Sequence, residues 1–296
     1  MRRFASAAIT AMALLAACPA VAQERLTAVA SFSILGDLVK NVAGDRWAVD
    51  TLVGPNGDAH TYSPSPTDAR KVAAANIVFV NGLGFEGWLE RLIEAAGTKA
   101  PIVVASNGIR PLERPGDHGH SHIDPHAWQS VANVKVYVAN IRDGLALADP
   151  ARKAAYEANA LAYLAKLDAL EQEVKGVIAR IPSDRRQVIT SHNAFGYFEH
   201  AYGIKFSAPQ GASTEVEASA KDVAAIIGQA RQQRVAAVFL ENVSDPRLVK
   251  QIASESGAKV GGTFYSDALT DDKGDAATYI DLMQNNLRQL STALIE

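Results

Sequence analysis

The chain is 296 residues long, 48% of them hydrophobic, and carries 29 Lys and Arg against 32 Asp and Glu, for a formal net charge of −3. This mild acidity, without a Lys/Arg-rich block, gives no support for binding to nucleic acid. A chain with one cysteine forms no internal disulfide, so its stability must come from a hydrophobic core, which a chain of this length can bury.

The first 22 residues are typical of a secretion signal. Arg2 and Arg3 form a basic start, residues 5–17 are mostly apolar, and residues 20–22 (Ala-Val-Ala) offer a small-x-small cleavage site. The apolar run is shorter than the about 20 residues that a membrane-spanning helix needs. We therefore expect a soluble periplasmic protein whose mature chain begins at Gln23.

Cys18 leaves a second interpretation open. It ends the segment Leu15-Ala16-Ala17-Cys18, which resembles a bacterial lipobox, where the cysteine is lipidated and becomes the first mature residue. Pro19 directly after it argues against this modification. A lipoprotein anchored through Cys18 is the alternative to a free periplasmic protein.

Strand-like and helix-like segments alternate from residue 23 to residue 148. This alternation predicts βα units with a parallel sheet, and thus an N-terminal α/β lobe over 23–148. The expected strands are 26–31, 48–53, 77–81 and 102–105, and the expected helices are 33–44, 66–75, 84–96 and 132–148.

A single long helix is expected next, over residues 149–181. Asp149 followed by Pro150 is a typical helix start. A helix of about 30 residues would be about 45 Å long, enough to run along two lobes as a rigid spine. Two helices with a break near Gly176 are the alternative. Apolar residues recur at helical intervals, at Leu161, Leu164, Leu167, Leu170 and Val174.

The alternation of strands and helices returns over residues 182–296, which predicts a second α/β lobe. We therefore expect an α/β fold of two lobes with mainly parallel sheets, joined by one long rigid helix. The expected strands are 187–191, 235–240 and 259–263, and the expected helices are 197–202, 218–233, 246–256 and 275–294.

Four candidate metal ligands, three histidines and an aspartate, are spread along the chain. His60 follows a strand in a turn-rich loop, His126 comes after Asp124-Pro125, and His192 and Asp267 each come directly after a strand. Ligands of α/β sheets bind beyond the carboxyl ends of the strands, so these residues are expected to meet in the cleft between the lobes. Three imidazoles and a carboxylate complete a four-coordinate shell for an ion such as zinc.

Each of these residues also has an ordinary interpretation. His60 and His126 alone would be loop histidines, His192 would be a helix cap, and Asp267 would be a turn residue. Their joint placement favours the metal site. Asp124 and Glu241 are candidates for orienting a ligating imidazole, with helix N-capping as the alternative for Glu241. His200 is interpreted as structural.

Four segments together resemble the metal-specific substrate-binding proteins of bacterial ABC importers, the cluster of zinc and manganese receptors. They occur in the order found in this family, and the long middle helix matches its inter-lobe helix. The segments are residues 54–62 with Asp58-Ala59-His60, Asp124-Pro125-His126-Ala127-Trp128, Thr190-Ser191-His192-Asn193-Ala194-Phe195 and Tyr265-Ser266-Asp267-Ala268-Leu269.

The resemblance implies that His60 and His126 come from the first lobe and His192 and Asp267 from the second. It also implies a receptor, not an enzyme, that passes a metal ion to the membrane permease of an ABC importer and works as a monomer. Loading of the site by a periplasmic metallochaperone is left open.

Zinc is the expected metal. Manganese receptors of this family tend to carry glutamate at the third ligand position, where this chain has His192. A nitrogen-rich shell of four ligands suits Zn²⁺, whereas manganese prefers more oxygen and more ligands. A manganese receptor and a lipid-anchored metal-binding adhesin are the alternatives. A zinc hydrolase is poorly supported, because catalytic zinc keeps an open position and no His-Glu-x-x-His motif is present.

Three further histidines, His118, His120 and His122, alternate with Gly119 and Ser121. Such a segment can chelate metal loosely, and it resembles a short version of the His-rich loop of zinc receptors. Its functional interpretation is an auxiliary loop that captures metal and passes it to His60 and His126. The alternative is a solvent-exposed loop without effect on transport.

Overall fold

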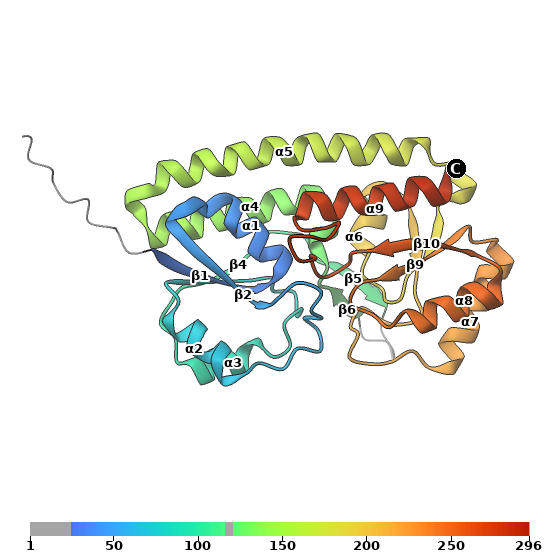
Figure 1. Cartoon of the computed structure of the whole chain (residues 1–296), viewed down its shortest axis with the longest axis horizontal. Helices are drawn as coiled ribbons and strands as arrows, with labels where there is room; N and C mark the ends of the chain where they lie inside the picture. The colour runs from blue at the N-terminus through green and yellow to red at the C-terminus, as the bar shows by residue number, and fades with distance from the viewer. Residues whose placement is uncertain (1–24, 116–120, 296) are drawn as a thin grey trace, which may run out of the picture.

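The computed structural model describes residues 25–115 and 121–295 as two α/β lobes side by side, with the helix α5 (Lys153–Arg180) running along both (Figure 1). The predicted fold class is confirmed. The expected signal sequence, Cys18, His118 and His120 lie outside the described residues. No helix in the described part of the chain has the length and apolar character needed to cross a membrane.

The first lobe contains a four-stranded parallel sheet in the order β2-β1-β3-β4. Its strands are apolar segments, and the two central ones, β1 and β3, are mostly buried. Helices α1 and α4 pack on one face of this sheet, and α2 and α3 lie on the other (Figure 1). The elements are β1 (Leu26–Phe32), α1 (Ser33–Ala43), β2 (Trp47–Val53), α2 (Pro66–Ala74), β3 (Ile77–Val80), α3 (Leu89–Ala96), β4 (Ile102–Val104) and α4 (Val131–Ala148).

The second lobe repeats this plan with a parallel sheet in the order β10-β9-β7-β8. Helices α7 and α8 cover one face, while α9 and α6 lie on the side of α5 (Figure 1). The elements are β7 (Gln187–Ile189), α6 (Gly196–Tyr202), β8 (Lys205–Ser207), α7 (Ala220–Gln233), β9 (Ala237–Glu241), α8 (Pro246–Ser256), β10 (Lys259–Phe264) and α9 (Tyr279–Leu294).

Helix α5 ties the two lobes together, because it packs on α1 and α4 of the first and on α9 and α6 of the second. Near its start, Tyr156 accepts a hydrogen bond from Nε1 of Trp47 (2.8 Å). Further along the helix, the carboxylate of Glu171 accepts a hydrogen bond from the hydroxyl of Tyr202 in the second lobe (2.8 Å). The helix is continuous through Gly176, so the alternative of two helices with a break there is wrong.

The start of α5 differs from the prediction. A 3-10 turn, Pro150–Arg152, precedes the helix, and the side chain of Asp149 makes no capping hydrogen bond. Asp149 instead accepts a hydrogen bond from the hydroxyl of Tyr156 (2.7 Å). Leu161, expected on the buried stripe, is 71% exposed, because the helix turns Tyr163 and Leu167 toward the core.

Two features went unpredicted from the sequence. The strand β8 is only three residues long, and an antiparallel hairpin of β5 (Leu112–Pro115) and β6 (Ser121–Asp124) lies between the lobes' main elements. Both are too short for a clear periodic pattern.

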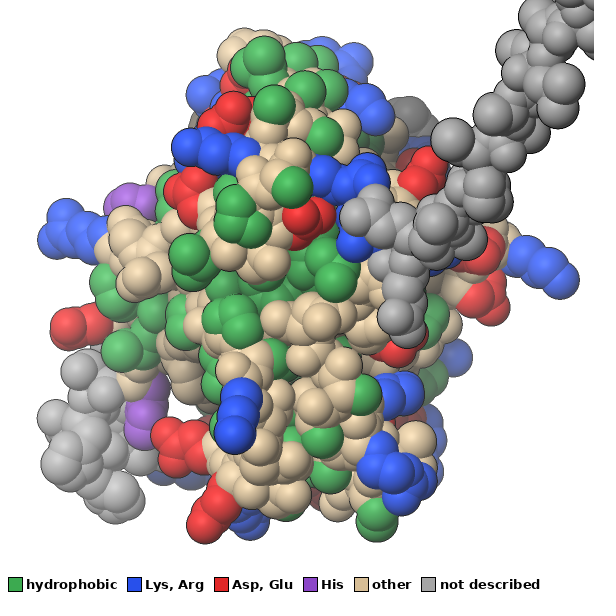
Figure 2. Space-filling view, turned by 90° about the vertical axis from the view of Figure 1, so that its left-hand side faces the viewer, with side chains coloured by type: hydrophobic (Ala, Val, Ile, Leu, Met, Phe, Trp, Pro, Cys, Tyr) green, Lys and Arg blue, Asp and Glu red, His purple; other side chains and the backbone are tan. Residues whose placement is uncertain are grey.

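Over the end face of the first lobe, Lys/Arg and Asp/Glu side chains are interspersed (Figure 2), in agreement with the small net charge.

Candidate metal centre

The four predicted ligands meet at one buried point between the lobes. One donor atom from each of His60, His126, His192 and Asp267 lies within 4.8 Å of all the others. The last three residues are completely buried, and His60 is 5% exposed. The structure thus brings together residues that are far apart in the sequence: His60 and Asp267 are separated by 207 positions (267 − 60). That these side chains bind a metal stays a prediction at this point.

The atoms that face one another are the Nε2 nitrogens and the carboxylate oxygens. Oδ2 of Asp267 lies 3.0 Å from Nε2 of His192 and 3.4 Å from Nε2 of His60. Oδ1 of Asp267 lies 3.6 Å from Nε2 of His126, and the Nε2 atoms of His60 and His126 are 3.2 Å apart. Three nitrogens and a carboxylate around one point form a donor set of the composition that zinc takes.

Each ligand follows a strand, which is why the fold gathers them. His60 lies in the loop after β2, His126 after β6, His192 after β7 and Asp267 after β10. The β7, β9 and β10 strands run parallel, so their carboxyl ends open on the same side. His192 extends this arrangement by a bridge to Gln210. The capping interpretation of His192 is wrong, because Phe195 is the N-cap residue of α6.

The backbone N–H of each of the three candidate histidines donates to a carboxylate. The acceptor for His60 is Oδ1 of Asp58 (2.9 Å). The acceptor for His126 is Oδ1 of Asp124 (3.0 Å), two residues before it. The acceptor for His192 is Oε1 of Glu241 (3.0 Å), at the end of β9. These bonds fix the position of each loop before any metal binds.

Two of these carboxylates also contact the ring nitrogen that points away from the site. Oδ1 of Asp124 lies 2.8 Å from Nδ1 of His126, and Oε2 of Glu241 lies 2.7 Å from Nδ1 of His192. With Nδ1 held by a carboxylate, Nε2 is left free to bind a metal. The expected role of Asp124 and the cleft-facing position of Glu241 both agree with this geometry. The N-cap of α8 is Asp245, so the capping interpretation of Glu241 is wrong.

Aromatic rings and an amide enclose the site, and the sequence patterns did not assign them a role. Phe85 packs edge-on against His60 with centroids 4.8 Å apart, and Trp128 packs against His126 at 5.3 Å. Nε1 of Trp128 and Nε2 of Gln129 both donate to the carbonyl of Ser266 (2.8 and 2.7 Å). Since Ser266 precedes Asp267, these bonds orient the aspartate. The position of Trp128 in the motif around His126 was the one sequence signal that could have indicated its place beside the site.

The electrostatics of the buried site favour an ionised aspartate. Burial alone would raise the pKa of Asp267, but His192 and His126 outweigh it and hold that pKa well below the usual value. Burial also opposes a charge on His192, yet Glu241 and Asp267 raise its pKa well above the ordinary histidine value. For His126 burial prevails and lowers the pKa. A metal ion bound through His192 would therefore compete with a proton for that ring.

Neither oxygen of Asp267 receives a hydrogen bond of good geometry, although both are fully buried. Nε2 of His192 is likewise buried without a well-aligned partner. Unpaired polar atoms at the centre of a protein are costly, so their convergence indicates a bound group that satisfies them. Four converging donors fill a tetrahedral shell and leave no position for a reacting water.

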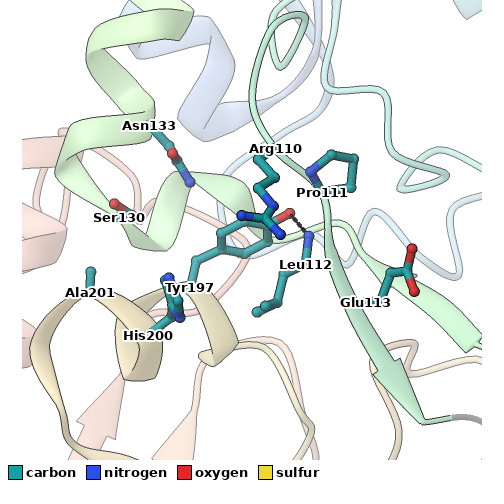
Figure 3. Close-up of a pocket in the computed structure, with 9 residues that line it drawn as sticks. All are labelled: Arg110, Pro111, Leu112, Glu113, Ser130, Asn133, Tyr197, His200 and Ala201. Carbon is teal, nitrogen blue, oxygen red and sulfur yellow. Dashed lines mark hydrogen bonds between the residues drawn. The ribbon is translucent and has the colours of Figure 1, made fainter.

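The two other histidines that the structure describes, His122 and His200, lie apart from this centre. His122, the described member of the predicted capture loop, is exposed on β6 opposite Arg114. The structural interpretation of His200 stays a prediction, and the side chain is exposed on α6. It lines a cavity of about 570 Å³ beside β5, where the hydroxyl of Tyr197 accepts a hydrogen bond from the backbone N–H of Leu112 at 2.9 Å (Figure 3).

Comparison with known proteins places the chain among metal-binding proteins. Residues 28–293 match the family model of the periplasmic component A of zinc-uptake complexes. The chain belongs to this family. One of the relatives below, PsaA of Streptococcus pneumoniae, is named a substrate-binding lipoprotein of a manganese ABC transporter, which supports a non-enzymatic role.

Similar proteins of this family span almost the whole chain. The iron-binding protein YfeA of Yersinia pestis is 33% identical, over 94% of this chain and 89% of its own length. The manganese-binding lipoprotein MntA of Halalkalibacterium halodurans is 36% identical, over 89% of this chain and 87% of its own. The manganese transporter lipoprotein PsaA of Streptococcus pneumoniae is 30% identical, over 92% and 90%.

Solved structures of family members have the same fold. The Mn-bound periplasmic metal-binding protein of Candidatus Liberibacter asiaticus superposes with a TM-score of 0.82 at 30% identity, over 91% of this chain and all of that one. The periplasmic zinc-binding protein TroA of Treponema pallidum superposes with a TM-score of 0.87 at 27% identity, over 92% and 100%. Family membership thus establishes a metal-binding receptor, while the names of the relatives differ in the metal.

Proposed function

We propose that this protein is an extracytoplasmic zinc receptor, which binds one Zn²⁺ tightly and delivers it to the membrane permease of an ABC importer. The observation that carries the proposal is the donor set. Three imidazole Nε2 atoms and one carboxylate converge at a fully buried point. Zinc accepts four nitrogen and oxygen donors of this kind in a closed tetrahedral shell. His60, His126, His192 and Asp267 are the proposed ligands.

Manganese is the second candidate metal, and the names of relatives support it. Two of the relatives are named for manganese, and the related structure from Candidatus Liberibacter asiaticus holds Mn. Against it stands the single carboxylate, because manganese prefers oxygen ligands and a larger coordination number. His192→Glu should therefore shift the preference toward manganese. Unchanged zinc-over-manganese selectivity in that variant would contradict this account of the metal preference.

The position outside the cytoplasm rests on the expected signal sequence over residues 1–22. Release into the periplasm is the first proposal, and anchoring through Cys18 is the alternative. Several relatives are named lipoproteins, which supports the anchored form. The auxiliary role of His118, His120 and His122 in metal capture is also a proposal. The described member, His122, is exposed to solvent, as a capture residue must be.

The test is a pair of competition titrations on the chain from Gln23 to Glu296, stripped of metal with a chelator. We expect one tight zinc equivalent and weaker manganese binding. His60→Ala and His192→Ala should each abolish the tight equivalent, while His200→Ala, an exposed histidine outside the centre, should leave it intact. Tighter manganese than zinc binding would retain the receptor and overturn the metal. No tight site for either ion would refute the receptor.

A further inference from the structure

One of the three carboxylates that hold the ligating histidines is bound across the cleft. Asp124 and Glu241 each contact both the backbone and the ring of the histidine they support. Asp58 supports the backbone N–H of His60 through Oδ1, and its other oxygen, Oδ2, accepts a hydrogen bond from the hydroxyl of Thr214 (2.5 Å). Thr214 belongs to the second lobe, 156 residues further along the chain.

The loop that carries Thr214 is attached to the other half of the metal centre. It connects β8 to α7 and begins beside His192. The backbone N–H of Gln210 donates to the carbonyl of Ser191 (3.3 Å), and that of Asn193 donates to the carbonyl of Gly211 (2.9 Å). Thr214 therefore reaches Asp58 from a segment that is fixed on both sides of His192.

The loop that carries Asp58 is likewise the one that carries His60. It contacts the second lobe at a further point, where the backbone N–H of Asn56 donates to the carbonyl of Leu269 (2.8 Å). Oδ1 of Asn56 accepts a hydrogen bond from Asn242 (3.1 Å). Residues 56, 58 and 60 thus each face the second lobe, and His60 can leave the centre only if these contacts open.

We propose that Asp58 and Thr214 form an inter-lobe latch, which positions His60 in the metal centre and sets the rate at which the metal is released. The proposal rests on the proposed receptor function and deepens it. The two residues are positioning residues, since neither offers a donor atom to the metal. Breaking the hydrogen bond removes one of the contacts that hold the loop of His60 to the second lobe, so that this ligand withdraws more readily without separation of the lobes from α5.

Opening such a latch should change the kinetics of release more than the coordination of the metal. In the proposed latch this hydrogen bond breaks when the loop of His60 opens, so its loss destabilises the closed state and speeds dissociation. Hydrogen bonds to charged groups are stronger than neutral ones. We expect dissociation to accelerate about tenfold when the hydroxyl is removed, equivalent to about 1.4 kcal/mol.

The test measures metal release from the whole mature chain loaded with Co²⁺ or Zn²⁺, after rapid mixing with excess chelator. Thr214→Val removes the hydroxyl but keeps the branched shape of the side chain, and Thr214→Ala removes both the hydroxyl and the methyl group. Thr214→Ser retains it. Ser213→Ala is the matched control, because the Ser213 hydroxyl accepts a hydrogen bond from Glu215 within the same loop (3.2 Å). The Co²⁺ absorption spectrum reports whether the four ligands are unchanged.

The expected result is release about tenfold faster in Thr214→Val and Thr214→Ala, with Thr214→Ser and Ser213→Ala near the wild type and the Co²⁺ spectra alike. Wild-type release rates in Thr214→Val and Thr214→Ala would overturn the latch and leave the receptor standing. Equal acceleration in all four variants would also overturn it, since loop integrity would then be the cause. A wild-type chain without a tight metal equivalent would overturn the receptor and the latch together.

Discussion

At the scale of single residues, the centre is organised by carboxylates that act on histidines and not on the metal. Asp58, Asp124 and Glu241 each accept a hydrogen bond from the backbone N–H of one ligating histidine. Asp124 could be proposed from the sequence, because it stands two residues before His126. Glu241 lies 49 residues from His192, so only the pairing of β7 with β9 shows what it holds.

The first prediction compares the effect on zinc affinity of removing a proposed ligand, His192, with that of removing the three histidines of the capture loop. His192→Ala should lower zinc affinity by more than about 100-fold, since even residues that only support a ligand typically contribute 10- to 100-fold. Replacing His118, His120 and His122 together by alanine should change affinity by no more than about threefold. Competition titration with a chromophoric chelator measures both. The reverse order of effects would mean that the centre is wrongly assigned.

The second prediction concerns pH. In the metal-free protein burial opposes a charge on His192, but Glu241 and Asp267 raise the pKa of this ring well above its ordinary value. Zinc and a proton therefore compete for Nε2 of His192, and zinc affinity should fall by up to about tenfold for each pH unit lowered. Titrations at pH 6, 7 and 8, with calorimetry in two buffers to count released protons, measure this dependence.

The control for the pH prediction is Glu241→Gln, which removes one of the carboxylates that raise the pKa of His192. Fewer protons should then be released on zinc binding at pH 7. Without metal, a folded-state pKa above the unfolded value stabilises the fold below about pH 6.5. This stabilisation is lost as the pH rises through the folded-state pKa. Affinity that stays constant from pH 6 to pH 8 would contradict the assignment.

At the scale of elements, close contact between helices and sheets places the strand ends that carry the ligands. Helix α4 approaches the first sheet at Gly144, where a Cβ atom would lie 2.7 Å from Cγ2 of Val103 and 3.3 Å from Cε1 of Phe79. Gly176 in α5 has open space at the same position. The sequence places both glycines inside predicted helices and does not distinguish them, because only the packed neighbours differ.

The third prediction therefore compares these two glycines. Gly176→Ala should stabilise the protein by up to about 1 kcal/mol, because alanine favours helix in an exposed interior position. Gly144→Ala gains the same propensity but overpacks the interface, so it should destabilise by roughly 1–2 kcal/mol. Denaturant unfolding of the metal-free proteins gives both values. Equal stabilisation by the two substitutions would show that α4 can move away from the sheet without cost.

At the scale of the whole molecule, α5 restricts how the lobes move. It packs on elements of both lobes, so a wide hinge opening would have to break contacts along a buried stripe. Release of the metal is therefore expected to depend on loops and small displacements. The continuous helix could be predicted from composition and spacing, but its register could not. Leu161 faces solvent while Tyr156 and Tyr163 are buried.

The fourth prediction follows from this restriction. Zinc should slow hydrogen exchange in the loop that carries His60, residues 54–65, and in the loop that carries Thr214, residues 208–219, and leave exchange in α5 nearly unchanged. Exchange measured by mass spectrometry on the metal-free and zinc-loaded chain separates these segments. Strong zinc-dependent protection along α5 would indicate a hinge-type movement. Equal protection of both forms across the second lobe would exclude a lobe or loop movement there.

The sequence by itself determined the α/β lobes, the long helix and the four candidate ligands. This was possible because strand and helix periodicity is local, and because residues that directly follow parallel strands meet at one edge of a sheet. The tertiary structure alone decided that Glu241 holds His192 and that Thr214 meets Asp58. These contacts join residues 49 and 156 positions apart. Such partners depend on how two folded lobes pack together, which no local pattern in the chain records.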